Sequence, residues 1–172
     1  NPVAVAVILL IGFLLLTGMP YADYFSGAQF VHFLLGPATV ALAVPLYQQI
    51  ARLRAVWLPA LAGLIVGVAT AALSAVGIAR LLGGSPETVL SLAPKSATAP
   101  VAMAIAERIG GIPALTAVMV VLTGVIGAIA GNKLLALLRI EDDSVCGVAI
   151  GVTAHGIGTA RAFQLSPQMG AF

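Results

Sequence analysis

The stretch Thr153-Ala154-His155-Gly156-Ile157-Gly158-Thr159-Ala160-Arg161 decides how this chain is interpreted, because it places polar groups inside an otherwise apolar run over residues 145–165. A run of that length can cross a bilayer, which takes about 20 residues. Ionisable side chains at membrane depth are costly and normally face a bundle interior or a wet cavity. Nearby glycines favour a helix that unwinds, and unwound backbone at that depth must be covered by protein or line water. The stretch therefore predicts half of a solute-binding site.

The composition of the whole chain indicates an integral membrane protein. Of its 172 residues, 60% are hydrophobic and 8% are charged, against roughly 25% charged residues in a soluble domain. Long apolar runs without strict alternation predict an all-α, polytopic transmembrane helical bundle. The net charge of +2 is too small to indicate a nucleic-acid partner, and the single Cys146 excludes an internal disulfide.

Residues 1–172 are interpreted as a single transmembrane domain. Asn1-Pro2 stands directly before an apolar run and the chain stops after a short polar stretch, so we expect a portion of a longer protein. Pro37 and Pro45 predict a bent helix over 30–50. Membrane-spanning apolar helices are expected over residues 2–19, 59–82 and 114–138, the last two as clean spans.

The charged connections suggest an orientation for these helices. Arg52 and Arg54 are expected in a loop over residues 51–56, and their positive charge assigns that loop to the cytoplasm. The charged residues 139–144 form a second expected loop. There Ser144 is a candidate cap for the helix that follows.

A second unusual membrane segment covers residues 90–109. It contains Pro94-Lys95-Ser96-Ala97-Thr98-Ala99-Pro100, and a lysine between two prolines does not belong to an ordinary span. We therefore predict two discontinuous helices, broken or re-entrant, over 90–109 and 145–165, which meet near the membrane midplane. Residues 38–50 also align weakly with 97–109. An internal structural repeat of the kind that transporters use is one interpretation, and chance similarity is the other.

Each candidate polar residue has a structural and a functional interpretation. Lys95 and Arg161 either snorkel to an interface and pair with nearby acids, or present cations to an anion. Ser96, Thr98, Thr153 and Thr159 either bond back to a preceding carbonyl or donate to a ligand. Helix-terminal N–H groups exposed at the breaks would also favour an anion.

His155 has three interpretations: a satisfied interior side chain, a direct ligand, or a proton-coupling group, since imidazole changes charge near neutral pH. A zinc site is not expected, because His32, His155 and Cys146 lack ligand spacing. Hydrolase, phosphate-loop and dinucleotide motifs are absent from the sequence. We therefore expect neither an enzyme nor a cofactor.

Four motifs make the chain similar to the LrgB/CidB family, which includes the plastid glycolate/glycerate translocator. They extend from residue 34 to residue 162 in the family's order. The motifs are Leu34-Leu35-Gly36-Pro37-Ala38-Thr39-Val40-Ala41-Leu42-Ala43-Val44-Pro45-Leu46-Tyr47, Pro94-Lys95-Ser96-Ala97-Thr98-Ala99-Pro100, Gly110-Gly111-Ile112-Pro113-Ala114-Leu115-Thr116-Ala117 and Ala154-His155-Gly156-Ile157-Gly158-Thr159-Ala160-Arg161-Ala162.

This resemblance implies two classes of function. Plastid members of the family resemble carriers of small hydroxy-carboxylates. Bacterial members are described as holin/antiholin-like regulators of murein hydrolase export and cell lysis, and also as pyruvate transporters that work with a small LrgA/CidA-type membrane partner. Family members usually have membrane segments before the position of Asn1 and after that of Phe172, so helices that complete the fold are expected outside this chain.

The residues agree best with transport, because a small carboxylate needs a cationic fork and a few neutral donors. We predict a transporter of small monocarboxylates of the pyruvate, glycolate or glycerate type, with a holin-like regulator as the alternative. It is expected in the bacterial inner (plasma) membrane as a multi-pass homodimer or higher homo-oligomer. The predicted substrate-binding residues are Lys95, Ser96, Thr98, Thr153, His155, Gly156, Gly158, Thr159 and Arg161.

Overall fold

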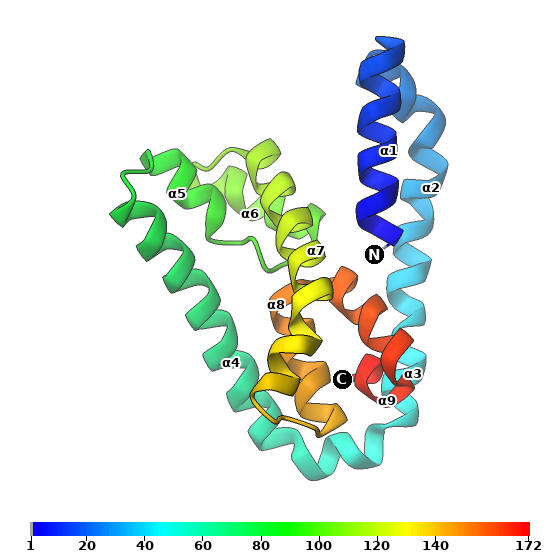
Figure 1. Cartoon of the computed structure of the whole chain (residues 1–172), viewed down its shortest axis with the longest axis vertical. Coiled ribbons are helices and arrows are strands. Elements are labelled where there is room, and N and C mark those ends of the chain that lie inside the picture. Colours follow the sequence, from blue (N-terminus) through cyan, green and yellow to red (C-terminus); the bar gives the residue numbers. More distant parts are fainter. Residues whose placement is uncertain (1) are drawn as a thin grey trace.

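The computed structural model describes residues 2–172, with the side chains of all of these except His32, Leu35 and Thr39. The described residues form only helices, and no strand occurs among them (Figure 1). The helices are α1 (Pro2–Thr17), α2 (Tyr21–Ala41), α3 (Ala43–Gln48), α4 (Ile50–Leu81), α5 (Pro86–Leu92), α6 (Ala99–Ile109), α7 (Pro113–Leu137), α8 (Asp143–Leu165) and α9 (Pro167–Ala171). The prediction of an all-α membrane bundle is confirmed.

Within the described part of the chain, α4 and α7 are long and apolar enough to cross a membrane. A third span is available if Tyr21–Val31 and Gly36–Gln48, which are bent by 43° relative to each other, cross as one. α1 is apolar, but its 16 residues extend only about 24 Å, less than the roughly 30 Å hydrocarbon core. The two clean spans expected at 59–82 and 114–138 are therefore found as long helices.

The basic loop expected over residues 51–56 is wrong, because these residues form the first turns of α4. Arginine is a good helix former, and charge by itself does not end a helix. The break occurs earlier, at Gln49, whose φ of −99° and ψ of 14° separate α3 from α4. Pro59 lies inside α4 without ending it.

α8 is a helical hairpin with two arms, residues 143–154 and 156–165. His155, between the arms, has φ 42° and ψ −144°, which no helical residue adopts. The Ser166 hydroxyl then donates a hydrogen bond to Asp143 Oδ2 over 2.6 Å. In a straight helix these two residues would be about 34 Å apart, so the chain reverses at His155. We call residues 143–165 the second hairpin.

α5, the turn over residues 93–98 and α6 form the first hairpin, residues 86–109. The chain leaves α5 beside Ser91 and returns to it after α6, since the Ile112 N–H donates to Ser91 Oγ over 2.7 Å. In Figure 1 this hairpin enters from the upper end of α7, whereas the second hairpin enters from the lower end. That either hairpin is a discontinuous helix within a membrane stays a prediction, as does the internal repeat.

The buried core is small and lies where α7, both arms of α8 and α9 meet. Leu135, Cys146, Ile150, Ala162 and Met169 form it. By contrast, α4 buries no residue, and most of its large apolar side chains are exposed. An exposed apolar surface of this length suits contact with lipid.

Candidate functional site

One face of α7 holds both hairpins. Thr116, Val120, Gly124 and Ala128 are buried and four residues apart, so they lie along one stripe of the helix. We call these four residues the α7 stripe. The first hairpin meets it at Thr116, whose hydroxyl donates to the Ser91 carbonyl over 2.9 Å. Ser91 and Thr116 are both fully buried, so the hydrogen bond between them does not compete with water.

The second hairpin meets the α7 stripe through His155. His155 Nε2 lies 2.9 Å from the Val120 carbonyl oxygen, and because a carbonyl can only accept, this nitrogen carries the proton. The ring fits because Gly124 has no side chain: a Cβ there would lie 2.8 Å from His155 Cε1. Since Thr116 and Val120 are one turn apart, about 6 Å along the axis, the end of α5 and the break in α8 lie close together.

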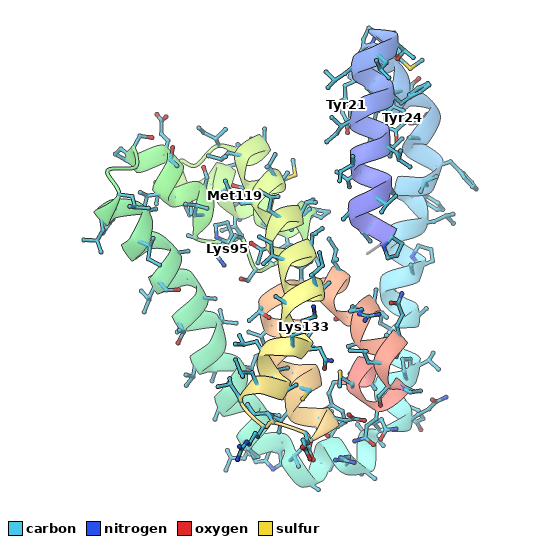
Figure 2. The ribbon with its side chains drawn as sticks, in the orientation of Figure 1. Tyr21, Tyr24, Lys95, Met119 and Lys133 are labelled. Carbon is cyan, nitrogen blue, oxygen red and sulfur yellow. The ribbon has the colours of Figure 1, made fainter. Side chains whose placement is uncertain are left out.

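The predicted residues of the first hairpin lie at its turn. Lys95 is half-buried, and its Nζ is 3.5 Å from the Ser96 hydroxyl. Figure 2 shows Lys95 below α5, where the hairpin turns. Thr98 precedes α6 in extended conformation, makes no side-chain cap hydrogen bond and is exposed. The side-chain polar atoms of these three residues therefore lie at the turn without capping α5 or α6.

The two threonines of the second hairpin bond back to their own helix. Thr153 Oγ1 donates to the Ala149 carbonyl over 2.7 Å, and Thr159 Oγ1 donates to the His155 carbonyl over 3.0 Å. Of the two glycines, Gly156 has open space where a Cβ would be, whereas a Cβ on Gly158 would lie 2.6 Å from Ala154 Cβ. Gly158 is thus explained by close packing of the two arms.

Arg161 lines a cavity of about 300 Å³ between the lower half of α7, the second arm of α8 and the start of α1. Its Nη1 donates to Gln164 Oε1 over 2.9 Å. Lys133 of α7 lines the same cavity, whereas Lys95 does not. The structure thus brings Arg161 together with a lysine that was not among the predicted site residues. The signal was present, since Lys133 stands inside an apolar span, but only the fold reveals its neighbour.

A second, mostly apolar cavity of about 450 Å³ lies between α4 and the first arm of α8. Arg52 and Asp142 line it and form an ion pair of 3.0 Å. Asp142 also caps α8 by accepting from the N–H groups of Ser144 and Val145, over 2.8 and 3.2 Å. The expectation that Ser144 caps this helix is therefore wrong; the carboxylate two residues earlier reaches both N–H groups.

The cap changes the acidity of Asp142. The N–H groups of Val145 and Ser144 stabilise the charged carboxylate and lower its pKa, and Arg52 lowers it further.

As for metals, no group of three or more His, Cys, Asp or Glu side chains that could hold an ion occurs among the described residues.

These features define an all-α membrane protein with two helical hairpins on one central helix. The chain belongs to the LrgB-like family, whose family model matches residues 1–172, and the resemblance seen in the sequence is confirmed. It is 39% identical over 170 residues to the uncharacterized protein YwbG of Bacillus subtilis, covering 99% of this chain and 76% of that protein. It is 36% identical over 172 residues to an uncharacterized protein of Haemophilus influenzae, covering 100% and 74%. No solved structure matches the chain.

Proposed function

We propose that this protein transports small monocarboxylates across the bacterial plasma membrane. The observation that carries the proposal is the position of the two hairpins, which approach α7 from opposite ends and reach its stripe one helical turn apart, at Thr116 and Val120. Interrupted helices that meet in this way form the substrate sites of many secondary transporters, because their broken backbone leaves polar groups unpaired.

The side chains near the breaks suit a short carboxylate. The Arg161 guanidinium offers a planar fork that matches both carboxylate oxygens. The Thr153 and Thr159 hydroxyls already donate to carbonyls, so toward a ligand they would act as acceptors for a substrate hydroxyl. Lys95, Ser96 and Thr98 do not line the cavity of Arg161, so they would contact the substrate at a second point of its path, from the first hairpin.

His155 contributes an acceptor and a route for proton coupling. Because Nε2–H donates to the Val120 carbonyl, Nδ1 of the neutral ring is left as an acceptor. Protonation there would turn it into a donor without disturbing the bond to α7. We expect His155→Ala to abolish uptake driven by a pH gradient and to spare exchange; unchanged driven uptake would reject proton coupling through His155.

This proposal includes an assembly. We infer a multi-pass protein that works as a homodimer or larger homo-oligomer, with a small LrgA/CidA-type membrane partner. Its function is transport rather than catalysis. The exposed apolar surfaces of α4 and α7 support a location among lipid or partner helices, because both helices are long and apolar enough to cross a membrane.

The test is uptake of labelled pyruvate and glycolate into proteoliposomes that contain the full-length protein or its Arg161→Gln variant. Saturable uptake that is lost in the variant supports the proposal. Arg80→Gln is the matched control, because Arg80 is an exposed arginine at the end of α4 and lines neither cavity. Absence of saturable uptake together with leakage of a neutral dye would overturn transport in favour of a holin-like pore.

A further inference from the structure

We propose that Lys133 and Arg161 together form the carboxylate-binding site, with Lys133 as a substrate-binding residue. This inference rests on the proposed function and names the second cation of its site. The two side chains come from different elements, α7 and the second arm of α8, and line one cavity of about 300 Å³. Figure 2 shows Lys133 on the lower half of α7.

The electrostatics of this cavity favour an anion. Its lining contains two cations and no aspartate or glutamate. Among the residues that the structure describes, the ion pair is Arg52 with Asp142, which lies at the other cavity. Within residues 2–172, no carboxylate therefore forms an ion pair with Lys133 or Arg161. Two like charges that share a small cavity repel each other, and an anion placed between them removes that cost.

Arg161 and Lys133 offer different donor geometries to a carboxylate. Arg161 already donates through Nη1 to Gln164 Oε1, which orients the guanidinium and leaves other N–H groups available. The fork suits the two oxygens of one carboxylate, while the Lys133 ammonium is a compact charge that needs no fixed plane. In the proposed site both cations contact the same carboxylate group.

The rest of the lining limits what the carboxylate carries. The lining side chains are otherwise mostly small or apolar: Pro2, Val3, Ala128, Ile129, Ile157, Ala160 and Gln164. A short carbon chain would contact methyl groups there, and Gln164 is the neutral polar group for a hydroxyl or keto oxygen. The cavity therefore fits a short monocarboxylate better than a chain with a second charge at its far end.

The site lies away from the tip of the second hairpin. Lys133 follows Gly124, which contacts the His155 ring, by nine residues, about 13 Å along α7. Arg161 follows the break at His155 by six residues, on the arm that runs in the same direction. The anion would therefore bind along this arm, and His155 would act at the upper end of the site.

Protection of a cysteine from chemical labelling tests this inference without relying on transport. Ala160 is an exposed residue of the cavity lining. Cys146, the one cysteine of this sequence, is replaced by serine, as is every cysteine of the full-length protein outside it. The full-length Ala160→Cys protein, in vesicles of zwitterionic lipid, is labelled with a thiol reagent at increasing pyruvate concentrations. We expect pyruvate to slow labelling. Adding Lys133→Gln should raise the concentration for half-protection about tenfold or more, the value of one charge-assisted hydrogen bond.

Two further variants sharpen the test. Lys133→Arg should restore most of the protection, because it keeps the charge, and Arg80→Gln should leave protection unchanged. Protection that is insensitive to Lys133→Gln would overturn the inference. So would labelling that responds only to anionic lipid and not to pyruvate, because the cavity would then hold a headgroup.

The same proteins separate this inference from the proposed function. Saturable uptake without protection of Ala160→Cys would place the site elsewhere and overturn only the role of Lys133. Protection without uptake would support the two-cation site and reject transport. Loss of both signals in protein with unchanged thermal stability would overturn both.

Discussion

Both hairpins of this protein contact one face of α7, but different kinds of contact hold them in place. The first uses neutral groups that are fully buried, Ser91 and Thr116. The second uses acidic groups at its base, where Asp143 accepts from Ser166 and the capping Asp142 pairs with Arg52 at a half-exposed position. The first turns over six residues, 93–98, and the second reverses at one residue with a positive φ.

This difference indicates which hairpin is easier to move. Buried neutral hydrogen bonds do not respond to pH or salt, whereas exposed ion pairs are screened and contribute little. A residue held in a rare backbone conformation also stores strain, which a second conformation can release. We therefore expect the first hairpin to stay with α7 and the second to change position when a ligand binds.

The largest effect is expected from adding a methyl group where the first hairpin closes. A Cβ on Gly111 would lie 2.9 Å from the Ser91 backbone nitrogen, which cannot move aside as a flexible side chain could. Gly111→Ala should lower the free energy of unfolding by about 3 kcal/mol, which is the upper end of the usual cost of overpacking. Thermal unfolding in detergent measures this, with Gly63→Ala as the control, since nothing lies within 4 Å there. Equal stability of both variants would contradict tight closure.

The hydrogen bonds of the two hairpins should differ in value. Ser91→Ala leaves the partly buried Ile112 N–H without its partner and should cost about 2 kcal/mol. Asp143→Asn keeps an acceptor for the Ser166 hydroxyl and removes only the charge near the start of α8, so it should cost about 1 kcal/mol or less. Hydrogen exchange of each hairpin shows which one opens. A larger loss for Asp143→Asn would reverse the comparison.

At the break in α8, glycine should be better tolerated than alanine. In an ordinary helix glycine is about 1 kcal/mol worse than alanine. His155 has φ 42° and ψ −144°, so alanine would keep the backbone strain and lose the ring bond, while glycine loses only the bond. His155→Gly should therefore unfold at a higher temperature than His155→Ala. If His155→Ala were instead the more stable variant, as alanine is in an ordinary helix, the backbone at the break would not be strained.

The smallest effect concerns acid and the capping carboxylate. The folded state lowers the pKa of Asp142, so its contribution to stability is present above the ordinary carboxyl pKa and is lost as pH falls through the lowered value. Asp142→Asn can still cap α8 but cannot be charged. The wild type should be the more stable protein at pH 7, and the difference should begin to shrink below about pH 4 and vanish once the pH lies below the lowered pKa. A difference that does not shrink as the pH falls below about 4 would mean that the charge is not its source.

The sequence predicts the long helices and the unusual segments better than it predicts which residues of these segments come together in space. Apolar length is a local property, so α4 and α7 are recognisable from the sequence. The partnership of Lys133 with Arg161 depends on how α8 folds back, which neither residue's neighbours reveal.

Predictions of the residue that caps or breaks a helix fail for a similar reason. Asp142 and Ser144 are both good caps, and only the backbone decides which oxygen reaches the free N–H groups. The break at His155 was suggested by Gly156 and Gly158, but the residue that takes the positive φ is the histidine itself. Composition near a break thus predicts its presence but not the residue that carries it.

The α7 stripe also sets which genetic changes this helix can accept. Thr116 and Val120 hold different hairpins from the same face, and one inserted residue between them would rotate everything beyond it by about 100°. His155 would then face a different side of the helix, although every side chain would still be present. Substitutions on the outer face of α7 leave this register intact, so the helix should vary in sequence far more freely than in length.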